Sequence, residues 1–156
     1  NDNTKRGNRE HRIASLKSTI ENPIPRVTLE SPQLGRATEF MLDTGAQPNL
    51  IKESMLKPGI EINAKKRLTL QGITERRIET LGSTYISIAQ KPVEFYIVPD
   101  SFPVTAEGLL GSSFCSSGVT ISYPEQQIKW GNVIIPFINN NVTLPARSVS
   151  CISLTR

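Results

Sequence analysis

Short apolar runs separated by turn-forming residues follow one another from Pro25 onward. Arg26 to Glu30 alternates between polar and apolar residues, which is the pattern of a half-buried strand. Gln71 to Glu75 lies between two such runs and predicts a hairpin with an exposed tip. Further strands are expected at Ala37 to Leu42, Asn49 to Ile51, Arg67 to Leu70, Arg76 to Leu81, Tyr85 to Ala89, Val93 to Val98, Thr120 to Tyr123, Gln127 to Trp130 and Ile134 to Ile138. Many short strands with frequent turns predict an all-β fold of closed or sandwich-like type.

Helix is expected in two short pieces. Lys52 to Leu56 suits a single helical turn, which Pro58 and Gly59 would close. Ser112 to Ser116 suits a short helix with a serine as its N-cap, because a serine hydroxyl can accept a hydrogen bond from the first free N–H groups. Neither piece changes the predicted class.

The charge of the chain is unevenly distributed. Its 156 residues, enough for one domain with its own core, carry a net charge of +4. Residues 1–20 hold five basic and two acidic side chains, so most of that charge lies in the leading segment. We therefore divide the chain into a basic leader or linker at 1–24, a folded domain at 25–137, and a C-terminal extension or linker strand at 138–156. A basic leader could contact RNA or a membrane, but a solvated linker is the simpler interpretation.

Composition argues against several classes of protein. No apolar run approaches the roughly 18–20 residues of a membrane span. Cys115 and Cys151 show neither the spacing of metal ligands nor a disulfide framework, so a reducing compartment and no metal are expected. A nucleic-acid-binding barrel would want a basic face interleaved with aromatic residues, whereas the charge here lies in the leader. No cofactor, membrane or nucleic-acid partner is therefore expected.

The run from Phe40 to Ala46 holds the candidate chemistry, because its apolar residues end on Asp43-Thr44-Gly45. Burying a carboxylate at the end of an apolar strand costs free energy unless the group is paired, so such an acid commonly has a function. The Thr44 hydroxyl can donate or accept a hydrogen bond beside it, and Gly45 permits a tight turn and the close approach of a ligand. The alternative is an Asx-type turn in which Asp43 accepts hydrogen bonds from backbone N–H groups.

Together with three later segments, this motif resembles the retropepsins, the aspartic proteases of retroviruses and long-terminal-repeat retrotransposons. Leu42 to Ala46 is similar to their catalytic motif, Leu70 to Ile78 lies where they have a flap hairpin, and Gly108 to Phe114 is similar to the segment that ends their core. Ile121 to Trp130 resembles the gypsy-like branch. The resemblance covers Pro25 to Phe137. It implies a closed β barrel with a flap and one short helix, and an active site at a two-fold dimer axis.

The implied function is an aspartic endopeptidase that cuts extended segments of its own Gag-Pol-type polyprotein. Such catalysis needs two carboxylates that share one proton and one water, but the chain has a single Asp-Thr-Gly sequence. The nearest second candidate, Asp100-Ser101-Phe102, has a phenylalanine where glycine is required. A homodimer would supply the missing half, with Asp43 of each subunit forming the dyad, Thr44 bracing the two loops and Gly45 binding substrate backbone. The implied location is the cytoplasm or a virus-like particle.

The resemblance also implies substrate contacts from the flap and from residues beside the catalytic motif. The implied substrate-binding residues are Leu42, Ala46, Gln71, Gly72, Ile73, Thr74 and Leu110. A place in the hydrophobic core is an equally good interpretation of the apolar ones.

Two single positions and the flap tip depart from the retroviral pattern. Many retroviral members have an acid after the alanine and an arginine after the late glycine, and these two pair. Here the positions hold Gln47 and Ser112, so no orphan charge is buried but the loop must be held differently. The flap tip carries Thr74-Glu75-Arg76 in place of a glycine-rich run. The second interpretation is therefore a catalytically inactive retropepsin-fold module for dimerisation or peptide binding. A shuttle-type retropepsin domain of ubiquitin handling is a variant of the first.

Overall fold

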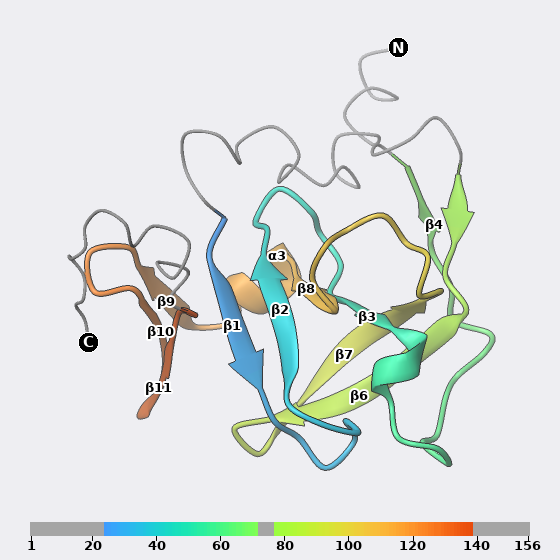
Figure 1. The fold of residues 1–156 in the computed structure, drawn as a ribbon, viewed down its shortest axis with the longest axis horizontal. Coiled ribbons are helices and arrows are strands. Elements are labelled where there is room, and N and C mark those ends of the chain that lie inside the picture. Colours follow the sequence, from blue (N-terminus) through green and yellow to red (C-terminus); the bar gives the residue numbers. More distant parts are fainter. Residues whose placement is uncertain (1–23, 72–76, 139–156) are drawn as a thin grey trace, which may run out of the picture.

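The computed structural model describes residues 24–71 and 77–138, and within them the chain is mostly β (Figure 1). The strands are β1 (Arg26–Leu29), β2 (Thr38–Leu42), β3 (Leu50–Lys52), β4 (Thr69–Leu70), β5 (Ile78–Glu79), β6 (Gly82–Ile88), β7 (Lys91–Val98), β8 (Gly108–Leu110), β9 (Val119–Ser122), β10 (Gln127–Trp130) and β11 (Val133–Pro136). The helices are the 3₁₀ turn η1 (Glu53–Met55) and the α-helix α3 (Ser112–Cys115). Neither of these two helices is long and apolar enough to cross a membrane. The predicted strands are confirmed, with ends shifted by a few residues.

A six-stranded sheet of order β1-β2-β8-β3-β7-β6 forms the body of the molecule. β2 runs parallel to β8, with Leu42 opposite Leu110, and β3 runs parallel to β7. The other neighbouring pairs are antiparallel. Because parallel strands end at the same edge of a sheet, the residues that follow β2 and β8 emerge side by side. Asp43 lies at this edge.

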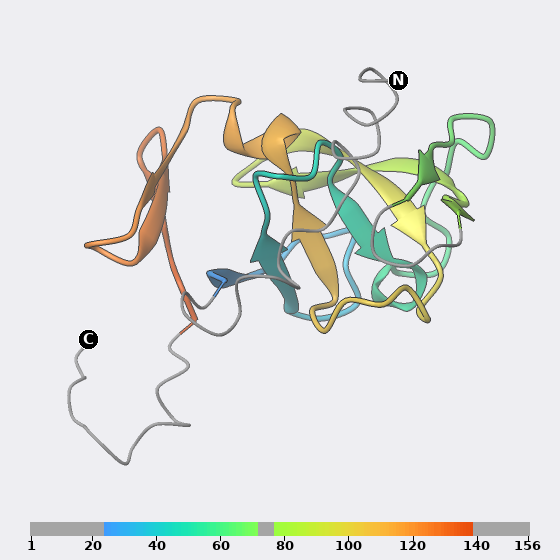
Figure 2. The same ribbon diagram turned by 90° about the horizontal axis from the view of Figure 1, so that it is seen from above.

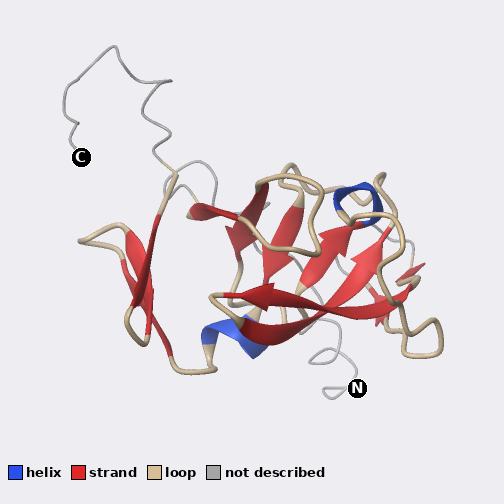
Figure 3. Ribbon diagram, turned by 90° about the horizontal axis from the view of Figure 1, so that it is seen from below, coloured by secondary structure: helices blue, strands red, loops and turns tan. Residues whose placement is uncertain are grey.

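A second sheet of order β11-β10-β9 lies to one side of the first (Figure 2). Its inner face is anchored by Ile128 and Trp130, and the Trp130 ring meets the edge of Phe114 on α3 with centroids 5.1 Å apart. The N–H of Ile138 donates to the carbonyl of Arg26 at 2.7 Å, which ties the end of this sheet to β1. Figure 3 shows α3 at the junction between the two sheets.

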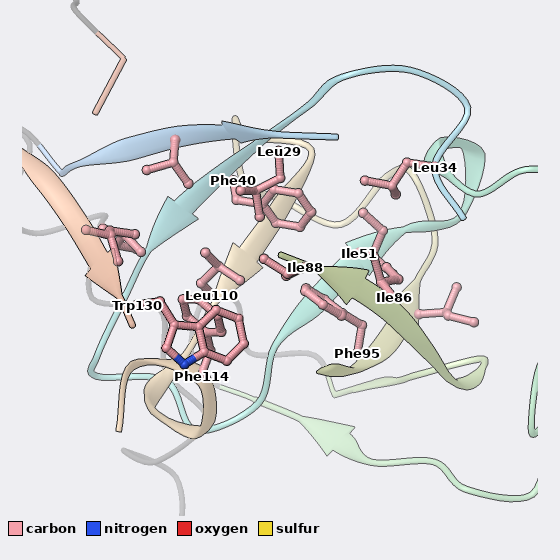
Figure 4. Packing of buried hydrophobic residues seen from close by; sticks show 14 residues of the cluster. Leu29, Leu34, Phe40, Ile51, Ile86, Ile88, Phe95, Leu110, Phe114 and Trp130 are labelled. Carbon is pink, nitrogen blue, oxygen red and sulfur yellow. The ribbon is translucent and has the colours of Figure 1, made fainter. Parts of the chain in front are cut away.

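The main sheet curls around a core to which both of its end strands contribute (Figure 4). β1 contributes Val27 and β6 contributes Ile86, both fully buried, while the rings of Phe40 on β2 and Phe95 on β7 lie 5.5 Å apart. Burying each such side chain stabilises the fold by roughly 1.5–3 kcal/mol. In the strand order of this sheet, β1 and β6 are the two edge strands among the described residues. Side chains from both edge strands pack into the same core, so the sheet is curved.

The predicted hairpin around residue 72 is confirmed at its base. β4 and β5 are antiparallel, with Thr69 opposite Glu79, and the N–H of Thr80 donates to the carbonyl of Leu68 at 2.8 Å. The tip, which includes the predicted flap residues Gly72, Ile73 and Thr74, lies outside the described residues. Gln71 is described and is half-buried.

The predicted serine N-cap of the short helix is wrong. The N-cap of α3 is Gly111, and no side chain caps this end. The reason is that the first N–H groups of the helix already have partners, because those of Ser112 and Ser113 donate to the carbonyls of Ala46 and Gln47. A side-chain cap is unnecessary when another loop supplies the acceptors.

Candidate active site

Asp43 directly follows β2, at the edge where β8 also ends. Its side chain is 5% exposed, and its N–H donates to the carbonyl of Leu110 at 3.0 Å. The N–H of Gly45 donates to its Oδ1 at 2.9 Å, and the N–H of Ala46 donates to its carbonyl at 3.1 Å. The loop therefore folds tightly around its own carboxylate. The hydrogen bond expected of an Asx-type turn is present.

The two residues after Asp43 lie on the surface. Thr44 and Gly45 are both exposed, whereas the strand before them and Ala46 after them are buried. The nearly buried carboxylate thus borders on solvent-exposed backbone. Burial disfavours the charged form of a carboxyl group, while a hydrogen bond from an N–H favours it. A carboxyl group that is nearly buried but borders on exposed backbone can exchange a proton with a ligand bound across that backbone.

Three hydrogen bonds, here called the backbone clamp, join residues 43–49, here called the Asp43 loop, to the start of α3. The N–H of Ser112 donates to the carbonyl of Ala46 at 2.7 Å, and that of Ser113 donates to the carbonyl of Gln47 at 3.1 Å. The third runs from the N–H of Gly111 to Oδ1 of Asn49 at 2.9 Å. The loop after Asp43 is therefore held by main-chain donors of the β8–α3 junction.

The backbone clamp occupies the place where the retroviral pattern would have an ion pair. Gln47 and Ser112 stand at those two positions, and their main chains take part in the clamp. The Gln47 side chain is exposed and uncharged. This is how the loop is held without the missing acid and arginine.

Gly111 is required by the closeness of the two segments. A Cβ atom on Gly111 would lie 2.3 Å from the carbonyl oxygen of Pro48 and 2.6 Å from that of Ala46. Real Cβ atoms essentially never come this close to backbone oxygen. The Asp43 loop and the β8–α3 junction can therefore pack only because this residue has no side chain.

Cys115 is the last residue of α3, and it is partly buried. Burial and, to a lesser extent, the neighbouring charge of Asp43 together raise the pKa of its thiol to about 11. Its Sγ lies 4.0 Å from the carbonyl of Leu110. The thiol is therefore held in its neutral form at physiological pH.

We expect Cys115 to resist alkylation in the folded protein. With Cys151→Ser as background, so that one thiol is read, iodoacetamide at pH 8 should modify Cys115 at least about tenfold more slowly in buffer than in urea, because the thiolate is scarce when folded. Mass spectrometry of timed samples measures this. Equal rates in the two conditions would show that the thiol is not buried as described.

The structure places the predicted site residues in three groups. Asp43, Thr44 and Gly45 form the loop just described. Three predicted pocket residues are buried in the core: Leu42 and Leu110 belong to the main cluster, and Ala46 belongs to a second cluster with Leu50 and Leu109. The remaining four come from the hairpin, of which only Gln71 is described.

Asn49 is the residue that the sequence analysis missed. Its side chain is 3% exposed and bridges the β8–α3 junction to β7. The available signal was a polar amide immediately before the apolar pair Leu50-Ile51, since a polar residue that enters a buried strand must find partners there. No three His, Cys, Asp or Glu side chains in the described residues could hold a metal ion together.

Comparisons with known proteins bear on this arrangement. No protein-family profile matches the chain. The structure is similar to the retroviral protease-like domain of Ddi1 from Leishmania major, with a TM-score of 0.59, 18% sequence identity, and coverage of 76% of this chain and 96% of that one.

The sequence is similar to the retrovirus-related Pol polyprotein from transposon 412 of Drosophila melanogaster. The two are 33% identical over 79 residues, which are 48% of this chain and 6% of the polyprotein. The matched segment thus spans a small part of that relative. The chain has a retroviral protease-like fold, and over this segment it is homologous to a retrotransposon Pol polyprotein.

Proposed function

We propose that this chain is one subunit of a homodimeric aspartic endopeptidase that cleaves extended segments of its own Gag-Pol-type polyprotein. The observation that carries the proposal is the Asp43 carboxylate, 5% exposed at the end of β2 and beside the exposed Thr44-Gly45 backbone. It stands in an Asp-Thr-Gly sequence on a retroviral protease-like fold. The relation to a Pol polyprotein supports the substrate class.

In the proposed mechanism the two Asp43 carboxyl groups of a dimer share one proton. Two negative charges this close repel each other, which disfavours ionisation of both carboxyl groups. One carboxyl therefore stays protonated while the other is ionised. The ionised group takes a proton from the bound water as that water attacks the peptide carbonyl, and the protonated group donates toward the carbonyl oxygen. Thr44 of each subunit would brace the two loops, and Gly45 would accept or donate hydrogen bonds to the substrate backbone.

The substrate would lie as an extended strand across the two exposed loops. The hairpin residues Gln71, Gly72, Ile73 and Thr74 would close over it. The burial of Leu42, Ala46 and Leu110 supports a role for them behind the loop, where they hold its shape, and it favours the core interpretation of these three side chains.

The second candidate is a catalytically inactive dimerisation or peptide-binding module on the same fold. It is favoured by the departures at Gln47, Ser112 and the hairpin tip. The intact motif and the tightly folded loop around Asp43 argue for the enzyme. Incubating the purified chain with its parent polyprotein, with and without a statine-containing peptide, distinguishes the two, because only the enzyme gives inhibitable cleavage.

Activity is expected to fall steeply on dilution. Each subunit supplies one carboxyl of the dyad, so cleavage requires the dimer, and the fraction of dimer falls as the protein concentration drops below the dissociation constant. Specific activity measured over a thousandfold dilution, beside the mass from sedimentation, tests this. A 17.2 kDa monomer that still cleaves, or a specific activity that stays flat, would contradict the homodimer.

A further inference from the structure

The side chain of Asn49 is nearly buried, and both ends of its amide are used. Its Oδ1 accepts the N–H of Gly111 at 2.9 Å, and its Nδ2 donates to the carbonyl of Glu94 on β7 at 3.0 Å. Its own carbonyl accepts the N–H of Tyr96 at 2.8 Å. One residue thus joins the end of the Asp43 loop, the β8–α3 junction and the long strand β7.

The β8–α3 junction, to which Asn49 is hydrogen-bonded, also forms the hydrogen bond to the main chain of Asp43. The carbonyl of Leu110 accepts the N–H of Asp43, and the N–H groups of Ser112 and Ser113 bind the loop carbonyls. Gly111 lies between these contacts, so fixing its N–H fixes the donors and acceptor on either side of it. A chain of short contacts therefore runs from the Asn49 amide to the Asp43 main chain.

Removing this amide would leave two buried groups without their partner. The N–H of Gly111 and the carbonyl of Glu94 lose the hydrogen bonds that the structure gives to Asn49. Unsatisfied buried groups are costly, so the local backbone would move to find water or new partners. Asn49 also lines a cavity of about 450 Å³ with Gln47, Pro48 and Glu94, which gives that backbone room to shift.

We propose that Asn49 is a positioning residue that sets the orientation of the Asp43 carboxyl through Gly111 and the backbone clamp. The inference rests on the proposed function, because orientation matters only if Asp43 is catalytic. The hydrogen-bond partners of Asn49 described above are the main chains of Gly111, Glu94 and Tyr96, so its effect on Asp43 is indirect. Small displacements of a catalytic group reduce turnover much more than they reduce substrate binding.

The first test separates turnover from binding and from folding. Asn49→Ala should lower kcat per active site, titrated with a tight-binding statine peptide, by tenfold or more, while KM changes less than twofold. The control is Asn63→Ala, which removes an exposed amide whose Oδ1 accepts the N–H of Lys65 and takes no part in the backbone clamp. It should keep the wild-type kcat. A wild-type kcat for Asn49→Ala, measured well below its Tm, would show a merely structural role and overturn the proposal.

A rescue variant sharpens the test. In Asn49→Asp the introduced carboxyl has the donor and acceptor of the amide when it is protonated, and lacks the donor when it is ionised. The ratio of its kcat to that of the wild type should therefore rise toward one as pH falls, while the ratio for Asn49→Ala stays flat. Glu94, which is paired with Lys66, and Tyr96 are the ionisable residues at this cavity and are common to all three proteins. A flat ratio for Asn49→Asp would contradict the assignment.

A readout without catalysis distinguishes failure of this inference from failure of the proposed function. In Asn49→Ala, and in Asn49→Ser should the first variant not fold, hydrogen exchange at the amides of Gly45, Ser112 and Ser113 should quicken by tenfold or more. Amides that pair β6 with β7 should keep their protection. If these loop amides stay protected, Asn49 does not position the loop. If they lose protection but the wild type shows no Asp43-dependent cleavage, the positioning stands and the enzymatic function is wrong.

Discussion

Replacing Asp43 by asparagine is expected to abolish peptide-bond cleavage while leaving the fold in place. An amide can neither share the proton of the dyad nor take one from water, so kcat/KM should fall by about 10³-fold or more. The fold should persist because the asparagine Oδ1 can still accept the N–H of Gly45, the contact that shapes the loop. Loss of two adjacent carboxyl groups also removes their mutual repulsion in a dimer.

The matched control for this variant is Asp100→Asn. Asp100 is the acid of the Asp-Ser-Phe sequence, the nearest second candidate, and its Oδ1 accepts the N–H of Ser54 at 3.0 Å on the exposed surface. We expect it to cleave at the wild-type rate, with at most a small loss of stability. Cleavage of a fluorogenic peptide and the circular dichroism of both variants measure the outcome. Near wild-type cleavage by Asp43→Asn would exclude an aspartic mechanism at this loop.

Gly111→Ala is expected to destabilise the protein strongly. The added methyl group would lie within 2.8 Å of three carbonyl oxygens of the Asp43 loop, those of Ala46, Gln47 and Pro48. Relief requires that the loop and the β8–α3 junction separate, which weakens the backbone clamp. Overpacking and lost hydrogen bonds together should cost about 3 kcal/mol or more of unfolding free energy. The corresponding loss in Tm is about 10 °C.

Gly35→Ala is the control, because a Cβ there meets only the carbonyl of Met55 at an ordinary 3.8 Å. Its stability should change little. Thermal or urea unfolding of both variants at one protein concentration measures the difference, since dimer formation would otherwise shift the Tm. A Gly111→Ala protein as stable as the wild type would mean that the loop and junction are not packed as closely as described.

The class and the acid loop could be predicted because local pattern decides them. Alternation in Arg26 to Glu30 and the apolar run before Asp43 identify buried strands without any knowledge of their partners. The hydrogen bond between Gly45 and Asp43 is likewise local, spanning two residues. The parallel pairing of β2 with β8 lies beyond such reasoning, since it joins segments that only the tertiary fold brings together.

The features that the sequence analysis predicted wrongly or overlooked depend on contacts between segments that are remote in the sequence. The serine N-cap was predicted from propensity. In the structure, carbonyl groups of the Asp43 loop accept hydrogen bonds from the first N–H groups of α3, so these groups need no serine cap. Asn49 was passed over because its partners, Gly111 and Glu94, are remote in the sequence. The sequence pattern is equally consistent with a pocket wall and with the core for three apolar residues, Leu42, Ala46 and Leu110. Only the burial seen in the structure distinguishes the two.

The pairing of β2 with β8 also determines when the site can form during synthesis. Asp43 leaves the ribosome early, but the carbonyl of Leu110 and the donors of Ser112 and Ser113 that hold its loop are made much later. Contacts of such long sequence separation form slowly and late in folding. A nascent or truncated chain that lacks α3 would therefore carry the acid in an unformed loop. On the function proposed above, this topology would delay a competent site until translation has passed α3, which would guard a polyprotein against premature cleavage.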